Sequence, residues 1–78
     1  MSAEETMKII TKQWCNLADL MKLLHCGRNK ALDVKKQIKN KLINEGYFIP
    51  GNDLPMHAVV DVLKIDIDRL EKIIRLGN

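Results

Sequence analysis

Aromatic residues are scarce in this 78-residue chain, which has one Trp, one Tyr and one Phe. Proteins that bind single-stranded nucleic acid stack bases on several aromatic side chains, so the scarcity disfavours that class. Long apolar runs are also missing, since none approaches the roughly 18 residues that a membrane-spanning helix needs. The N-terminal MSAEETMK carries acids where a secretory signal peptide has basic residues and an apolar segment. The sequence therefore predicts a cytoplasmic protein with no membrane partner.

Patterns of catalysis and metal binding are missing too. The two cysteines, Cys15 and Cys26, lack the short spacing of a metal knuckle, and without an export signal we expect reduced thiols. We expect core or surface roles for His25 and His57 rather than metal binding. We find no glycine-rich phosphate loop, Ser-His-Asp set or paired-carboxylate cleft. We therefore expect no enzyme, no metal, no cofactor and no small-molecule substrate.

Positive charge is concentrated in one part of the chain. Residues 22–41 contain seven Lys and Arg against a single acid, Asp33, so this segment carries +6 whereas the whole chain carries only +3. The segment reads as a helix, a short turn and a longer helix. A helix-turn-helix that carries nearly all of a small protein's positive charge is typical of a nucleic-acid reader. The expected partner is double-stranded DNA.

Capping and turn residues predict a mostly α (α+β) fold, a small winged helix-turn-helix with a short hairpin wing and C-terminal helices. We expect residues 1–6 to be a flexible N-terminus and residues 7–78 to form a single DNA-binding domain. The first expected elements are a brief strand or extended entry over 7–12, a helix capped by Asn16 and Asp19 that ends near His25, and a helix from its Asn29 cap to about Asn44 before Gly46. A hairpin wing over 46–54, a helix from Pro55 to about Lys64 and a helix over 67–76 capped by Asp66 are expected to follow.

The longer helix of this unit divides into two faces. Ala31, Val34, Ile38 and Leu42 fall on one stripe, which we expect to pack on the preceding helix. The opposite face would enter the major groove, whose width suits an α-helix. The candidate DNA-binding residues are Arg28, Asn29, Lys30, Asp33, Lys36, Gln37, Asn40, Lys41 and, at the wing tip, Asn52.

The side chains of the reading face suit base recognition. Amides such as Asn40 can pair with adenine, Arg28 and Lys30 can reach guanine or phosphate, and Asp33 can accept from cytosine. Lys35 and Lys39 flank the inner stripe together with Lys41, so we expect them at the DNA backbone or in solvent. The alternative for each position is a solvated helix residue, and for the acidic wing a cover over the core.

The last helix carries a second candidate surface. Its apolar stripe serves either as core or as a docking surface for a second copy on DNA or for another protein. The candidate protein-interaction residues are Ile67, Leu70, Ile73 and Ile74.

Two stretches resemble known proteins. Residues 16–31, NLADLMKLLHCGRNKA, resemble the start of the winged helix-turn-helix in MerR-like excisionases of phages and integrative elements. Residues 46–48, GYF, through residues 54–63, LPMHAVVDVL, are similar to the end of a small uncharacterised family of Gram-positive conjugative elements. His25 stands where the excisionases commonly have glycine, and the wing here is acidic.

The resemblance implies a bacterial recombination directionality factor of a mobile element. Such proteins bind the arms of attachment sites, often in several copies, bend the DNA and steer an integrase towards excision. The family's recognition role would fall on Arg28, Asn29, Lys30, Lys36, Gln37 and Asn40. Two alternatives stay open: a transcriptional regulator on the same fold, and a protein–protein adaptor whose basic helix recognises an acidic partner.

Overall fold

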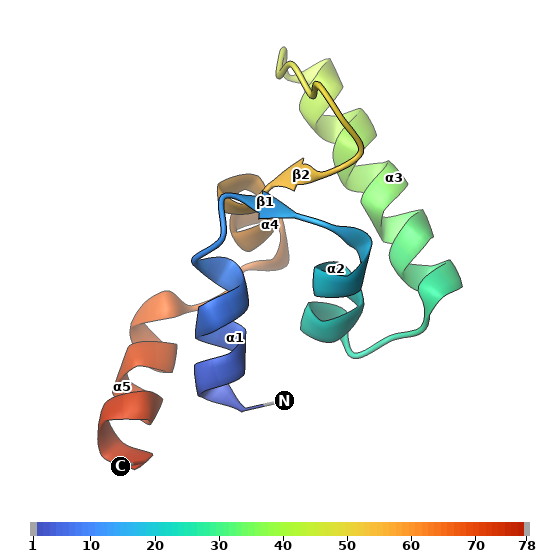
Figure 1. The fold of residues 1–78 in the computed structure, drawn as a ribbon. Helices are drawn as coiled ribbons and strands as arrows, with labels where there is room; N and C mark the ends of the chain where they lie inside the picture. The colour runs from blue at the N-terminus through green and yellow to red at the C-terminus, as the bar shows by residue number, and fades with distance from the viewer. Residues whose placement is uncertain (1, 78) are drawn as a thin grey trace.

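The computed structural model describes residues 2–77, and over that range five helices surround one two-stranded antiparallel sheet (Figure 1). The mostly helical α+β fold expected from the sequence is confirmed, and the arrangement is compatible with a small winged helix. No helix in the described range is long and apolar enough to cross a membrane.

The first element is a helix, α1 (Ala3–Ile10), so the expectation of a strand over 7–12 is wrong. Residues 3–6, expected to be flexible, form its first turn, while Met1 lies outside the described residues. The Ser2 side chain accepts a hydrogen bond from the Glu5 N–H at 3.2 Å and caps the helix. This cap and packing against the C-terminal helix outweigh the β propensity of Ile9 and Ile10.

Helix α2 (Leu17–Leu24) begins and ends where the sequence predicts. Asn16 Oδ1 accepts from the Asp19 N–H at 2.8 Å, and Asp19 Oδ2 accepts from the Asn16 N–H at 3.2 Å. These two bonds form the expected capping box. Lys12 Nζ lies 2.6 Å from Asp19 Oδ2, which gives this buried carboxylate a charged partner. His25 ends the helix in the left-handed region, with φ 52° and ψ 47°.

Helix α3 (Arg28–Asn44) starts slightly earlier than expected. Its N-cap is Gly27, which makes no side-chain capping bond, and Asn29 lies inside the first turn rather than at the cap. The C-terminal end is as expected: Gly46 has φ +94°, and the N–H groups of Gly46 and Tyr47 donate to the carbonyls of Ile43 and Leu42. This double bond pattern with glycine in the left-handed region is a Schellman motif.

The strand pairing differs from the expected hairpin. Strand β1 (Trp14–Cys15) pairs antiparallel with β2 (Leu54–Pro55), so that Trp14 faces Pro55 and Cys15 faces Leu54. The expected pairing of two arms within residues 46–54 is therefore wrong, and residues 47–53 form an irregular loop between α3 and β2. The turn residues were recognised, but the partner strand lies about forty residues earlier and carries no local signal.

Helices α4 (Met56–Leu63) and α5 (Ile67–Gly77) complete the chain. Asp66 Oδ1 accepts from the Arg69 N–H at 3.0 Å, which confirms the expected cap of α5. Helix α5 lies beside α1, away from α3 (Figure 1). The core is centred on the sheet, and its fully buried larger side chains are Cys15, Leu20, Leu54 and Val59.

The left-handed glycine at the end of α3 gives a stability prediction. Gly46→Ala places a Cβ on a residue with φ +94°, and we expect a loss of about 1 kcal/mol in the free energy of unfolding. Gly51→Ala is the matched control, because that glycine has an ordinary φ and open space around its Cβ. Urea denaturation measures both variants, and equal stability of the two would contradict the assigned backbone geometry.

The buried Cys15 thiol gives a pH prediction. Burial raises its pKa from 9.0 to about 11, with the Asp19 carboxylate adding to the increase. Since the unfolded chain releases this proton near pH 9 and the folded chain only near pH 11, stability falls across that window, by at most about 3 kcal/mol. Denaturation midpoints from pH 8 to 11 should show this fall in wild type and Cys26→Ala. In Cys15→Ala the fall should be smaller. Parallel curves of midpoint against pH for wild type and Cys15→Ala would contradict the assignment of this fall to the Cys15 thiol.

Candidate nucleic-acid interface

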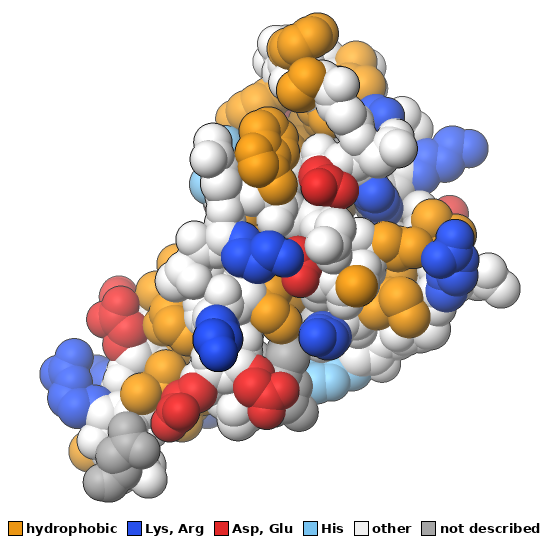
Figure 2. Space-filling view, in the orientation of Figure 1, with side chains coloured by type: hydrophobic (Ala, Val, Ile, Leu, Met, Phe, Trp, Pro, Cys, Tyr) orange, Lys and Arg blue, Asp and Glu red, His pale blue; other side chains and the backbone are white. Residues whose placement is uncertain are grey.

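The two faces of α3 lie as the sequence predicts. Ala31, Ile38 and Leu42 are buried in the core, and Val34 is half-buried. The residues expected to meet DNA are all exposed, namely Arg28, Asn29, Lys30, Asp33, Lys36, Gln37, Asn40 and Lys41 on α3 and Asn52 in the loop. Figure 2 shows several Lys and Arg side chains over α3 on the right of the view, and others in the centre and at the lower left.

Three of these side chains already have a partner one turn away along the chain. Gln37 Nε2 donates to Asp33 Oδ2 at 3.1 Å, one turn away along the helix. Lys41 Nζ lies 3.0 Å from Glu45 Oε1, and both residues are largely exposed. A base edge or phosphate would have to compete with these contacts. Asp33, Gln37 and Lys41 would therefore contribute less to the free energy of DNA binding than unpaired side chains would.

A groove runs between α3, the start of α2 and the loop. It is open to solvent, encloses about 530 Å³, and is lined by Leu17, Arg28, Leu32, Lys35, Lys36, Lys39 and Asn52. Four of these seven residues are basic and none is acidic. Cations that line a concave surface with low-dielectric walls concentrate positive potential there, which attracts an anionic polymer.

The groove adds to what the sequence indicates for two lysines. Lys35 and Lys39 are half-buried beside the inner stripe, as expected, but they also line the groove together with Arg28 and Lys36. The three- and four-residue spacing of Lys39 from Lys36 and Lys35 was available in the sequence. The position of Asn52 opposite the row was not, because it depends on the path of the loop back to β2.

Of the outward-facing residues, only part therefore forms a common concave site. The structure brings Arg28, Lys36 and Asn52 together, whereas Asn29, Lys30, Asp33, Gln37, Asn40 and Lys41 are not among the lining residues of this groove. The side chains outside the groove form a convex ridge on the exposed side of α3. A convex helix face suits insertion into a DNA groove, and the flanking cations suit the phosphate walls.

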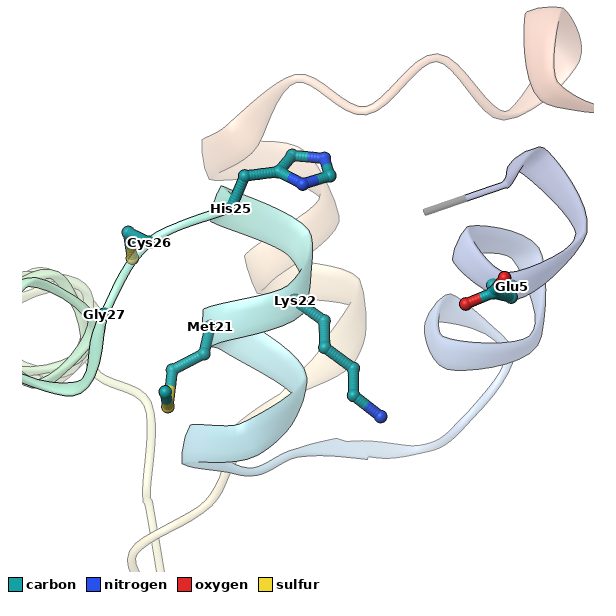
Figure 3. Close-up of a pocket in the computed structure, with 6 residues that line it drawn as sticks. All are labelled: Glu5, Met21, Lys22, His25, Cys26 and Gly27. Atoms are coloured by element: carbon teal, nitrogen blue, oxygen red, sulfur yellow. The ribbon is translucent and has the colours of Figure 1, made fainter.

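A second hollow, of about 450 Å³, lies between α1 and the turn that joins α2 to α3 (Figure 3). It is lined by Glu5, Met21, Lys22, His25, Cys26 and Gly27. Glu5 comes from α1, whereas His25 and Cys26 follow α2 and point apart (Figure 3). Within residues 2–77, no three His, Cys, Asp or Glu side chains gather in a way that would hold a metal ion.

The candidate protein-interaction stripe of α5 is shared between two environments. Leu70 and Ile74 are half-buried on a helix that packs against α1. Ile67 and Ile73 are 39% and 46% exposed. The stripe thus contributes to intramolecular packing and still leaves apolar surface open.

Comparison of the chain with protein-family models, with curated proteins and with solved structures found no match.

The clustering of lysines predicts opposite effects of two charge variants on α3. Lys39 follows Lys35 by four residues, so Lys39→Gln removes a like-charge repulsion and should stabilise the fold by about 0.3 kcal/mol at low salt. Lys41→Gln, the matched control, loses the Glu45 ion pair and should destabilise by a similar amount. Urea unfolding at low and high salt measures both. A destabilised Lys39→Gln would argue against a repulsive basic row.

Proposed function

We propose that this protein binds duplex DNA through α3 and its adjoining groove, and that it acts as an excisionase-like recombination directionality factor. The observation that carries the DNA proposal is the basic groove, whose lining includes Arg28, Lys35, Lys36 and Lys39 and no acidic residue. Clustered cations destabilise a free helix, so such a row is consistent with a polyanionic ligand that neutralises it.

The proposed binding mode assigns different tasks to the two parts of the surface. Helix α3 has 17 residues and is therefore roughly 25 Å long, enough to cross the major groove. The groove cations hold the phosphate backbone, and Asn52 contacts it from the loop. The exposed amides Asn29 and Asn40 on the ridge read base edges, since an Asn amide can pair bidentately with adenine.

The excisionase role is supported by the sequence resemblance and by the separation of α3 from α5 in the fold. Helix α3 and helix α5 lie on different parts of the molecule (Figure 1). A protein bound through α3 can therefore present Ile67 and Ile73 to an integrase or to a second copy on neighbouring DNA. In this role the protein acts in the bacterial cytoplasm, at the attachment-site arms of a mobile element.

A salt titration tests the DNA proposal. Affinity for a mixed-sequence duplex should fall steeply with salt, and Lys35→Gln with Lys39→Gln should reduce the slope of log K against log salt by about 2. Asn40→Ala should leave the slope unchanged and weaken discrimination between sequences. Lys72→Gln on α5 is the control and should bind as wild type does. Failure of the wild-type protein to bind duplex at low salt would refute the proposal.

The excisionase role has a separate test. Excision of the cognate element by its integrase should require this protein and should fail with Lys35→Gln plus Lys39→Gln. DNA binding without any effect on excision would instead favour a transcriptional regulator on the same fold.

A further inference from the structure

The three aromatic side chains of the chain are all partly in solvent, and Phe48 is the extreme case. Trp14 is 38% exposed, Tyr47 is 44% exposed and Phe48 is 85% exposed. An exposed Phe forgoes roughly 2 kcal/mol that burial of its ring would contribute. Trp14 and Tyr47 retain contacts with the fold, whereas Phe48 contributes almost nothing to the core.

The backbone on both sides of Phe48 is anchored. Before it, the Tyr47 N–H donates to the Leu42 carbonyl at 2.9 Å, and the Tyr47 ring lies 6.2 Å from the His57 ring. After it, Ile49 is half-buried and packs against the core, and Pro50 fixes the next φ. Phe48 therefore lies between Tyr47, which is half-exposed but keeps a backbone bond and a ring contact, and Ile49, which packs on the core.

Phe48 follows a basic helix, although the two charged residues closest to it in the sequence, Glu45 and Asp53, are acidic. It follows the end of α3, whose residues sum to a charge of +5, and Ile43 in the last turns of that helix is 50% exposed. The same loop continues to Asn52, which lines the basic groove. Figure 1 shows the loop extending beyond the C-terminal end of α3 and returning along that helix to β2. An exposed apolar side chain, Phe48, and one lining residue of the basic groove, Asn52, thus belong to the same short loop.

We propose that Phe48 is a wedge that inserts its ring between neighbouring base pairs of duplex DNA and kinks the duplex. The inference rests on the proposed DNA binding and adds the residue that bends the DNA. Proteins that bend DNA commonly insert Phe, Leu, Ile, Met or Pro side chains at a base step, next to cations that hold the flanking phosphates. A polyanion is favoured as the occupant over an apolar protein surface because the adjoining helix and groove are strongly cationic.

The test compares binding and bending in one duplex. A mixed-sequence duplex with flexible TA and CA steps carries a fluorescence donor and acceptor at its two ends. Wild type should shorten the end-to-end distance, whereas Phe48→Ala should lose most of this change. Its affinity should weaken by at most about fivefold, because the lost wedge contacts and the avoided cost of unstacking largely cancel. Phe48→Leu should retain part of the bend.

A fluorescence variant reports insertion directly. In Trp14→Phe with Phe48→Trp, the single tryptophan sits at the loop, and stacking on bases should quench its emission and protect it from acrylamide. Leu76→Ala is the matched control, because Leu76 is also 85% exposed but lies on α5, and it should bend DNA as wild type does.

Three outcomes would overturn the wedge. Binding by Phe48→Ala with an unchanged bend would refute it and leave the proposed DNA binding intact. A change in oligomeric state of Phe48→Ala without DNA, seen by sedimentation, would assign the ring to a protein contact instead. Failure of wild type to bind any duplex at low salt would refute the wedge together with the function on which it rests.

Discussion

The antiparallel pairing of Trp14–Cys15 with Leu54–Pro55 is the constraint on which the rest of the structure depends. It joins the two ends of the segment that contains α2, α3 and the loop, and the Met56 N–H extends it by donating to the Gln13 carbonyl at 2.9 Å. Two of the largest fully buried side chains, Cys15 and Leu54, face each other in this pairing. The pairing fixes where the loop after α3 returns to the sheet, and this loop brings Asn52 to the basic groove.

Local signals in the sequence predicted most helix ends correctly, because caps and turns act over a few residues. Asn16 with Asp19 and the left-handed Gly46 are such signals, and the structure confirms both. The strand expected over 7–12 failed because β-branched residues favour a strand only weakly when a capped helix can pack on α5. The partner of β2 could not be predicted, because a two-residue ladder has no periodicity to detect.

The candidate site was predictable in part for the same reason. Exposure on α3 follows from helical periodicity, so the outward position of Asn40 and the burial of Ile38 were correct. The concave groove depends on the course of the loop, which places Asn52 opposite Lys35 and Lys39. A wheel drawn from sequence shows which residues share a helix face but contains no neighbouring element. It therefore assigned these two lysines to a flank and missed the surface that they share with the loop.

The exposed surface of α3 and its loop is poorly suited to a protein without a partner. A basic row repels itself, and an exposed Phe48 ring leaves apolar area in water, so both features cost free energy in the isolated chain. The proposed complex would recover both costs at once, since phosphates neutralise the row while a base step covers the ring. Charge attraction acts at long range and on any duplex, whereas insertion at a step depends on how easily that step unstacks. The protein would thus select DNA sites partly by how easily a base step deforms, in addition to base reading by the α3 amides. This selection does not require a cationic wing.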